Sequence, residues 1–346
     1  MRTGLALRTQ NKGAALLLAM LTVTLVATLA ASALWQQWRG IEVESAERSR
    51  LQASWVLVGA LDWARLILLE DARAGSVDHL GEPWAIPLQE ARLSTFLAAD
   101  KTTSVDKEDT LPQAFLSGTI TDQQARLNVF NLVDGAKLSE PSMRAFGKLF
   151  ELLGLPPAEL DSLANSLRIA SSVNVGNATV NAANVNNVNV SGSNTGTAVN
   201  TAADDFTPQA PLLAQRVDQL VWLGLSVSSL ESLRPHITLL PVRTPVNINT
   251  ASATVLYASI PGLDMAQAQR LVSARQSSHF TVLADATKVL GPAIQLEGSE
   301  QSVSTRFFEV QGRFRLDQAV TQERSTVQRE GLAVKVLWRE RVTPAL

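Results

Sequence analysis

The stretch AALLLAMLTVTLVATLAASAL, residues 14–34, decides the fold because it holds 21 consecutive uncharged residues. As a helix with a rise of ~1.5 Å per residue it is ~31 Å long, enough to cross a hydrocarbon core of ~30 Å. A short basic leader precedes it and ends in Gly13. Cleavage of a secretory signal peptide removes the apolar core, whereas a cut after Gly13 leaves it as an N-terminal anchor. The alternatives are an uncleaved signal anchor and a signal peptide cut near residues 31–33.

The charges on either side of this span predict its orientation. Three cations lie in the leader, whereas Arg39 on the other side is followed by three glutamates between residues 42 and 47. The positive-inside rule therefore places residues 1–13 in the cytoplasm and the chain beyond about residue 40 across the membrane. Trp35 and Trp38 stand where an interfacial aromatic belt is expected.

The helical pattern continues beyond the span. Leu51, Trp55, Val58 and Leu61 recur at intervals of three and four, and no proline occurs between residues 14 and 82. This spacing is typical of one helix face. We predict one long helix to about residue 70, whose second half packs on a globular domain. The alternative is a membrane span followed by a separate amphipathic helix.

A helical region fills the middle of the chain. Residues 140–170 have a helical pattern, and residues 173–200 hold nine asparagines and no charge, which predicts a mobile surface insertion. Further on, two amphipathic segments flank the turn Ile260-Pro261-Gly262-Leu263, with Thr250 or Ser252 as the helix N-cap. This is the pattern of a helix-hairpin-helix unit.

The C-terminal region has the residue pattern of β-strands. Apolar and polar residues alternate approximately between residues 303 and 342, with turns predicted at Gly312, near Asp317 and at Gly331. Three such runs predict an antiparallel meander.

Composition and motifs argue against catalysis. The chain has 346 residues, a formal net charge of −2 and no cysteine, which excludes disulfides, thiolate metal sites and cysteine nucleophiles. The near-neutral charge argues against a protein that mainly neutralises nucleic-acid phosphates. No P-loop, His-Glu-x-x-His or Gly-x-Ser-x-Gly motif occurs, and His79, His236 and His279 lie far apart in the sequence. We therefore expect that the protein is not an enzyme.

The junction of Lys12-Gly13 with the following Ala-Ala-Leu-Leu-Leu run resembles the cleavage site of type IV prepilin-like proteins. In that family a membrane-embedded prepilin peptidase cuts after the glycine and methylates the new N-terminus, which here implies Gly13 and Ala14. Most members have glutamate as the fifth mature residue, where this chain has Leu18. That glutamate neutralises the amine of the subunit above it in the fibre. Its absence points to a tip subunit, the minor pseudopilin K of type II secretion.

Two further segments resemble the same family, also called general secretion pathway protein K. They are GTITDQQARLNVFNL at residues 118–132, in which we expect Asp122 and Arg126 to hold a turn, and VNINTA at residues 246–251. The second is shared with helix-hairpin-helix proteins. The resemblance covers most of residues 8–342 and breaks only around residues 164–203.

The resemblance implies an α+β, pilin-like fold: a long N-terminal helix on an antiparallel sheet, with a large inserted α-helical domain containing a helix-hairpin-helix-like unit. It divides the chain into a leader peptide (1–13), a transmembrane and fibre helix (14–34), the continuation of that helix (35–70), the first part of the pilin-like domain (71–139), the inserted α-domain (140–297, with the asparagine-rich insertion at 173–200) and the C-terminal strands (298–346).

The implied function is that of a minor pseudopilin at the tip of the type II secretion pseudopilus, which supports pseudopilus assembly and the export of folded proteins across the outer membrane. The implied partners are the minor pseudopilins I and J (and H) and the prepilin peptidase. The implied location is the bacterial inner membrane, single-pass, with a cytoplasmic N-terminus and a periplasmic C-terminal domain. For assembly we expect a role of Leu18, Leu51, Trp55, Val58 and Leu61.

A calcium site is one interpretation of the acidic pair Asp204 and Asp205. In the family this part of the chain contains an acidic loop that binds calcium, most of which is missing here. Because calcium takes six to eight oxygen ligands, two carboxylates are also consistent with a solvated acidic turn.

Two functions from other classes remain as alternatives. A membrane-anchored DNA-uptake receptor would offer the amides of its helix-hairpin-helix turn to a phosphate, but Asp264 beside that turn would repel it, so we expect no nucleic acid among the partners. The other is a structural inner-membrane protein that forms no fibre.

Overall fold

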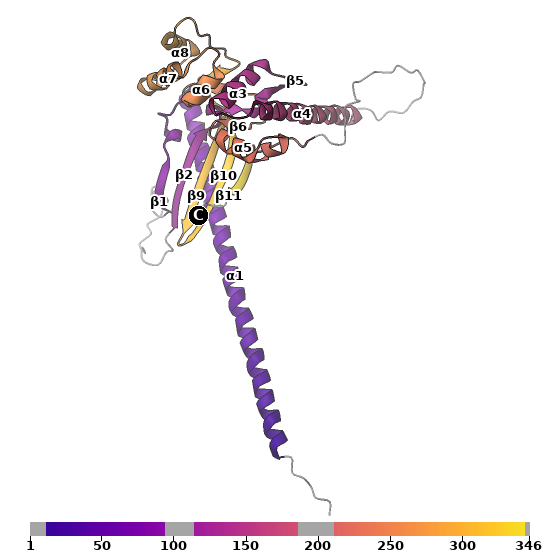
Figure 1. Cartoon of the computed structure of the whole chain (residues 1–346). Helices are drawn as coiled ribbons and strands as arrows, with labels where there is room; N and C mark the ends of the chain where they lie inside the picture. Colours follow the sequence, from indigo (N-terminus) through magenta and orange to yellow (C-terminus); the bar gives the residue numbers. More distant parts are fainter. Residues whose placement is uncertain (1–11, 94–113, 186–210, 343–346) are drawn as a thin grey trace, which may run out of the picture.

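A single long helix dominates the computed structural model, which describes residues 12–93, 114–185 and 211–342 (Figure 1). Helix α1 runs without interruption over Lys12–Ala74. Its N-terminal half projects away from the rest of the molecule as a free rod. The threonine hydroxyls of this rod bond to backbone carbonyls of the preceding turn, as Thr22 does to Ala19 at 2.9 Å. No polar hydroxyl therefore needs water there, which suits an apolar environment.

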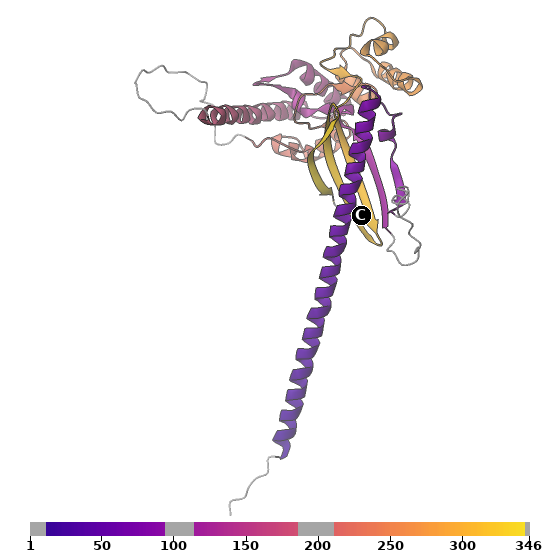
Figure 2. The ribbon, with the colours of Figure 1, turned by 180° about the vertical axis from the view of Figure 1, so that it is seen from behind.

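The C-terminal half of α1 lies across one face of a five-stranded antiparallel sheet, visible from behind in Figure 2. The strand order is β1-β2-β9-β10-β11, and the strands are β1 (Leu88–Arg92), β2 (Ala114–Asp122), β9 (Phe307–Leu316), β10 (Ala319–Glu330) and β11 (Ala333–Val342). The last three form the predicted meander. Because β2 and β9 are neighbours in the sheet, everything between them in sequence is an insertion into the sheet.

One predicted turn is wrong. Gly312 lies inside β9, directly opposite Gly118 of β2, and not between two strands. A Cβ on Gly312 would lie 2.9 Å from Cδ2 of Leu57 on α1, and a Cβ on Gly118 would lie 2.9 Å from the carbonyl oxygen of Gln311. Gly312 thus lets the helix approach the sheet closely, and Gly118 avoids a clash with the backbone of the neighbouring strand β9. Glycine has this role inside strands as well as in turns.

The insertion contains most of the remaining helices, which gather at the far end of the sheet, away from the free rod (Figure 1). They are α3 (Glu140–Leu152), α4 (Pro157–Val185), α5 (Val227–Leu233), α6 (Ala253–Ser259), α7 (Met265–Ser277) and α8 (Leu283–Leu290), joined by the 3-10 turns η2 (Gln123–Ala125), η3 (Val129–Leu132) and η4 (Val217–Leu223). Short strand pairs tie the insertion together: β3 (Leu127–Asn128) with β6 (Ile237–Thr238), β4 (Val133–Asp134) with β5 (Lys137–Leu138), and β7 (Val246–Asn247) with β8 (Gln301–Ser302). This arrangement confirms the predicted fold class.

The asparagine-rich stretch differs from the prediction in its first part. Helix α4 extends to Val185, so residues 173–185 continue a helix of the inserted domain. Leu163 and Leu167 are buried in the core and anchor the start of this helix, and elongation of an anchored helix adds one hydrogen bond for each residue that is ordered.

The helix-hairpin-helix-like unit consists of α6, the turn at Gly262 and α7. Gly262 has φ of +75°, a left-handed conformation that glycine adopts without strain. Ser252 caps α6 by accepting from the Val255 amide at 3.3 Å. Asp264 and Gln267 form a capping box at the start of α7. The Asp264 carboxylate is therefore already used to stabilise a helix end.

Candidate functional site: the helix surface, its groove and the seam

The free rod of α1 carries the residues predicted for processing and fibre packing. Gly13 and Ala14 lie in its first turn, and the side chain of Leu18 is 68% exposed. Among the described residues, α1 is the one helix that is long and apolar enough to span a membrane. Asp204 and Asp205 lie outside the described residues.

Above the rod, the predicted assembly stripe divides between two faces of α1. Leu51 and Trp55 are 61% and 75% exposed, whereas Leu61 is 8% exposed and packs on the sheet. Val58 lies at the border and is half-buried. A helix turns ~100° per residue, so Leu61 is rotated by about 80° from Leu51. The stripe is therefore wide enough to reach from the exposed side of α1 at Leu51 to the packed side at Leu61.

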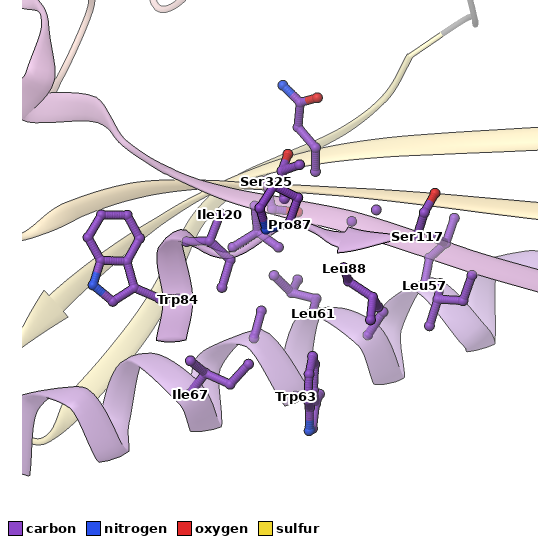
Figure 3. A pocket seen from close by; sticks show the side chains of 18 of the residues that line it. Leu57, Leu61, Trp63, Ile67, Trp84, Pro87, Leu88, Ser117, Ile120 and Ser325 are labelled. Atoms are coloured by element: carbon purple, nitrogen blue, oxygen red, sulfur yellow. The ribbon is translucent and has the colours of Figure 1, made fainter. Parts of the chain in front are cut away.

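The buried face of α1 borders an apolar groove (Figure 3). The cavity has a volume of about 280 Å³ and lies between α1, the segment from η1 (Pro83–Ala85) to β1, and the sheet. Its walls are mostly apolar and include Leu57, Leu61, Ile67, Trp84, Leu88 and Ile120. The exposed Ile86 lies on the segment beside it. Such a surface can accept apolar side chains of another chain. The sequence did not reveal it because six elements, some of them more than 200 residues apart, contribute to it.

A buried ionic seam joins α1 to the sheet. The Arg329 guanidinium of β10 donates to Asp71 of α1 at 2.6 Å, to Asp78 at 2.5 Å and to the Thr305 carbonyl at 3.0 Å. Asp78 also accepts from the Thr305 amide at 2.7 Å. Burial raises the pKa of Asp78 to about 7, against the lowering effect of the Arg329 charge. One feature of the sequence indicates this seam: Arg329 occupies an inward position in the alternation of β10, where an apolar side chain is expected.

The seam continues into the inserted domain through Asp122. Its carboxylate accepts from the Thr250 hydroxyl at 2.6 Å, the Asn247 amide group at 3.0 Å and the Gln124 backbone N–H at 2.6 Å. Burial raises the pKa of Asp122. Asn247 also donates to the Asp78 carbonyl at 3.1 Å. The expectation that Asp122 and Arg126 hold a turn is confirmed for Asp122, whose bond from the Gln124 N–H caps the 3-10 turn η2. It is wrong for Arg126, which makes no ion pair with Asp122.

Three carboxylates in this region lie close enough to hold a metal ion, since oxygens of Asp71, Asp78 and Glu82 are within 4.8 Å of one another. Each already has a donor: Arg329 serves the two aspartates, and the Trp84 indole N–H donates to Glu82 at 2.6 Å. The guanidinium therefore supplies the positive charge that these groups need, and their role is structural.

Two histidines that lie far apart in the sequence meet beside the seam. The rings of His79 and His279 stack with centroids 3.8 Å apart and an interplanar angle of 9°. Burial lowers the pKa of His79, which favours the neutral ring and so permits stacking. These two rings connect the segment after α1 with the loop between α7 and α8.

Comparison with known proteins agrees with this architecture. Two family models, both described as type II secretion system (T2SS), protein K, match residues 125–242 and 246–304, about half of the chain. Type II secretion system protein K of Pseudomonas aeruginosa strain PAO1 is 28% identical over 320 residues, which cover 88% of this chain and 84% of that protein. A chain in the crystal structure of the GspK-GspI-GspJ complex from the enterotoxigenic Escherichia coli type 2 secretion system has a similar fold, with a TM-score of 0.58, 16% identity and coverage of 86% of this chain and 99% of that chain.

Proposed function

Because the chain belongs to the family of type II secretion system protein K, we propose that it is a minor pseudopilin at the tip of the type II secretion pseudopilus, where it supports pseudopilus assembly and the export of folded proteins. The observation that carries this proposal is the separation of two parts along α1. An exposed apolar rod lies at one end and the broad inserted domain at the other (Figure 1). The rod can pack among other fibre helices, whereas the domain is wide enough to block a further subunit above it.

The apolar rod is a single-pass membrane anchor before assembly. We propose that its N-terminus is cytoplasmic and the inserted domain periplasmic, as the charges around the span favour. Processing after Gly13 would leave Ala14 as the first mature residue. Leu18 would then lie where a subunit with a neighbour above it needs a carboxylate, which is consistent with a place at the tip.

The partners in this proposal are the minor pseudopilins I and J, with H. The solved relative was crystallised together with GspI and GspJ. Leu51 and Trp55 offer exposed apolar area on α1, Val58 lies at the edge of this surface, and Leu61 acts indirectly by holding the helix on the sheet. The proposal includes the division of the chain into a fibre helix (14–34), its continuation (35–70) and an inserted domain (140–297).

No catalytic step is part of this function, because the family is a structural component of secretion machinery. A calcium site at Asp204 and Asp205 stays a prediction, as does the asparagine-rich insertion beyond residue 185.

The processing step tests the proposal directly. In cells that contain prepilin peptidase, mass spectrometry of the wild-type protein should find N-methylated Ala14 as the first residue. Gly13→Leu should keep the leader and migrate more slowly on electrophoresis, because a bulky side chain blocks the cut. Gly4→Leu, in the same leader, is the matched control and should be processed normally. A mature N-terminus elsewhere, or equal processing of both variants, would contradict the proposal.

A further inference from the structure

A second cavity lies on the opposite face of the sheet from α1. It has a volume of about 310 Å³ and is bordered by the sheet, by Gln123 and Arg126, and by residues 215–240 of the inserted domain. The sheet contributes Glu309, Gln311, Arg324, Thr326, Trp338 and Glu340. Apart from Gln311, which borders both spaces, the β9 and β10 residues among them alternate along the strands with those that line the apolar groove, so they lie on the other face. The cavity is therefore separate from the surface proposed for assembly.

The lining of this cavity has one more positively charged than negatively charged side chain. Its charged lining consists of four arginines and three carboxylates: Arg126, Arg216, Arg234, Arg324, Asp218, Glu309 and Glu340. Arg216 pairs with Glu340 at 3.0 Å and Arg234 with Asp218 at 2.6 Å. Arg324 lies between Glu309 and Glu340 at 3.8 and 3.7 Å. Among the described residues, Arg126 alone of these four makes no ion pair, so the excess positive charge of the lining resides there.

Two residues that line this cavity, Gln123 and Arg324, have buried hydrogen-bond donors without acceptors in the described part of the chain. The side chain of Gln123 is buried and accepts from the Thr238 hydroxyl at 2.8 Å, while its Nε2 has no partner among the described residues. Nε of Arg324 is likewise buried and makes no hydrogen bond there. A buried donor without an acceptor costs about 1–3 kcal/mol. An acceptor would therefore stabilise Nε2 of Gln123, Nε of Arg324 and the guanidinium of Arg126.

The local fold explains why these donors stand together. Gln123 belongs to the 3-10 turn η2 that follows β2, and Arg126 comes directly after it. The parallel pair of β3 and β6 then places Arg126 beside His236, whose carbonyl accepts from the Leu127 amide at 2.9 Å. Burial and the charge of Arg126 lower the pKa of His236, so that this ring is a neutral neighbour.

We propose that this cavity is a binding site for a carboxylate, which is received by the guanidinium of Arg126 and by Nε2 of Gln123. A carboxylate supplies acceptor oxygens and one negative charge, which match the unpaired donors and the single excess positive charge. The group is carried either by a small free acid or by an acidic side chain of a neighbouring chain. The site does not depend on the assembly role proposed above, since α1 takes no part in it.

Calorimetric titration of the full chain in detergent micelles tests this site, with succinate as the small acid and a blocked hexaglutamate peptide as the source of acidic side chains. We expect saturable binding to one site at low ionic strength, weakened by added salt. Binding of succinate alone identifies a small acid, and binding of the peptide identifies a side chain. If neither probe binds at up to about 20 mM, a concentration that would reveal even a very weak complex, the proposal is wrong.

Variants assign the binding to these residues. Arg126→Gln should weaken binding by about tenfold or more, because it removes a charge-assisted contact. Arg313→Gln is the matched control, since Arg313 is an exposed arginine on the same face of β9 outside the cavity; it should change binding by less than about twofold. Gln123→Glu places a carboxylate inside the cavity and should abolish binding without lowering the melting temperature. Binding unchanged in either Arg126→Gln or Gln123→Glu would overturn the assignment, and the melting temperature of each variant shows that it is folded.

Discussion

Leu61 and Leu51 differ in what they stabilise, although they have the same side chain and lie ten residues apart on one helix. Leu61 is buried in a cluster with Trp84 and Phe308, whereas Leu51 faces outward. Leu61→Ala removes three carbons, worth about 0.8 kcal/mol each in transfer free energy, and adds the cost of a cavity. One side of Leu61 borders the apolar groove, so it loses fewer contacts than a fully enclosed leucine would. We expect a loss of about 2–3 kcal/mol in the free energy of unfolding.

Leu51→Ala should change the free energy of unfolding by less than about 0.5 kcal/mol, because it removes little buried area. Urea unfolding of the full chain in detergent micelles, followed by circular dichroism, measures both values. Leu68→Ala at a fully buried position and Leu66→Ala at an exposed one serve as controls on the same helix. If Leu51→Ala costs as much as Leu61→Ala, both leucines lie on one packed face and the division of the stripe is wrong.

Three further predictions concern the sheet and the seam. Gly118→Ala should destabilise the fold by about 1–3 kcal/mol in urea unfolding, because its Cβ meets a backbone carbonyl that cannot move aside; an unchanged midpoint would refute this close approach. Arg329→Met should lower the free energy of unfolding by about 3–5 kcal/mol, since it leaves Asp71 and Asp78 buried without their counter-ion. A decrease of less than about 1 kcal/mol would show that the seam is solvated. The raised pKa of Asp78, about 7, means that the folded state holds this proton more tightly than the unfolded state does. Its contribution to stability is therefore fully present below pH ~4 and is lost as the pH rises through about 7. Asp78→Asn should flatten this part of the plot of the free energy of unfolding against pH. Equal slopes for the wild-type protein and the variant would contradict this prediction.

Much of the architecture follows from local patterns. An uncharged run of membrane-spanning length predicts the rod, the lack of a proline or glycine cluster predicts the continuation of α1, and alternation predicts the C-terminal strands. The turn residue Gly262 and the cap Ser252 mark the helix-hairpin-helix-like unit in the same way. Each of these signals depends on residues a few positions apart, and backbone geometry alone translates them into structure.

Tertiary structure decided which faces of these elements meet. Glycine is typical of turns, yet Gly312 lies within a strand because α1 packs directly over it. Asp122 and Arg126 are four residues apart and of opposite charge, yet the chain turns between them, so that Asp122 faces the seam and Arg126 the second cavity. Arg329 finds its carboxylates more than 200 residues earlier in the sequence. Periodicity in a sequence carries no information on such pairings, because burial and charge compensation depend on neighbours that only the folded chain brings together.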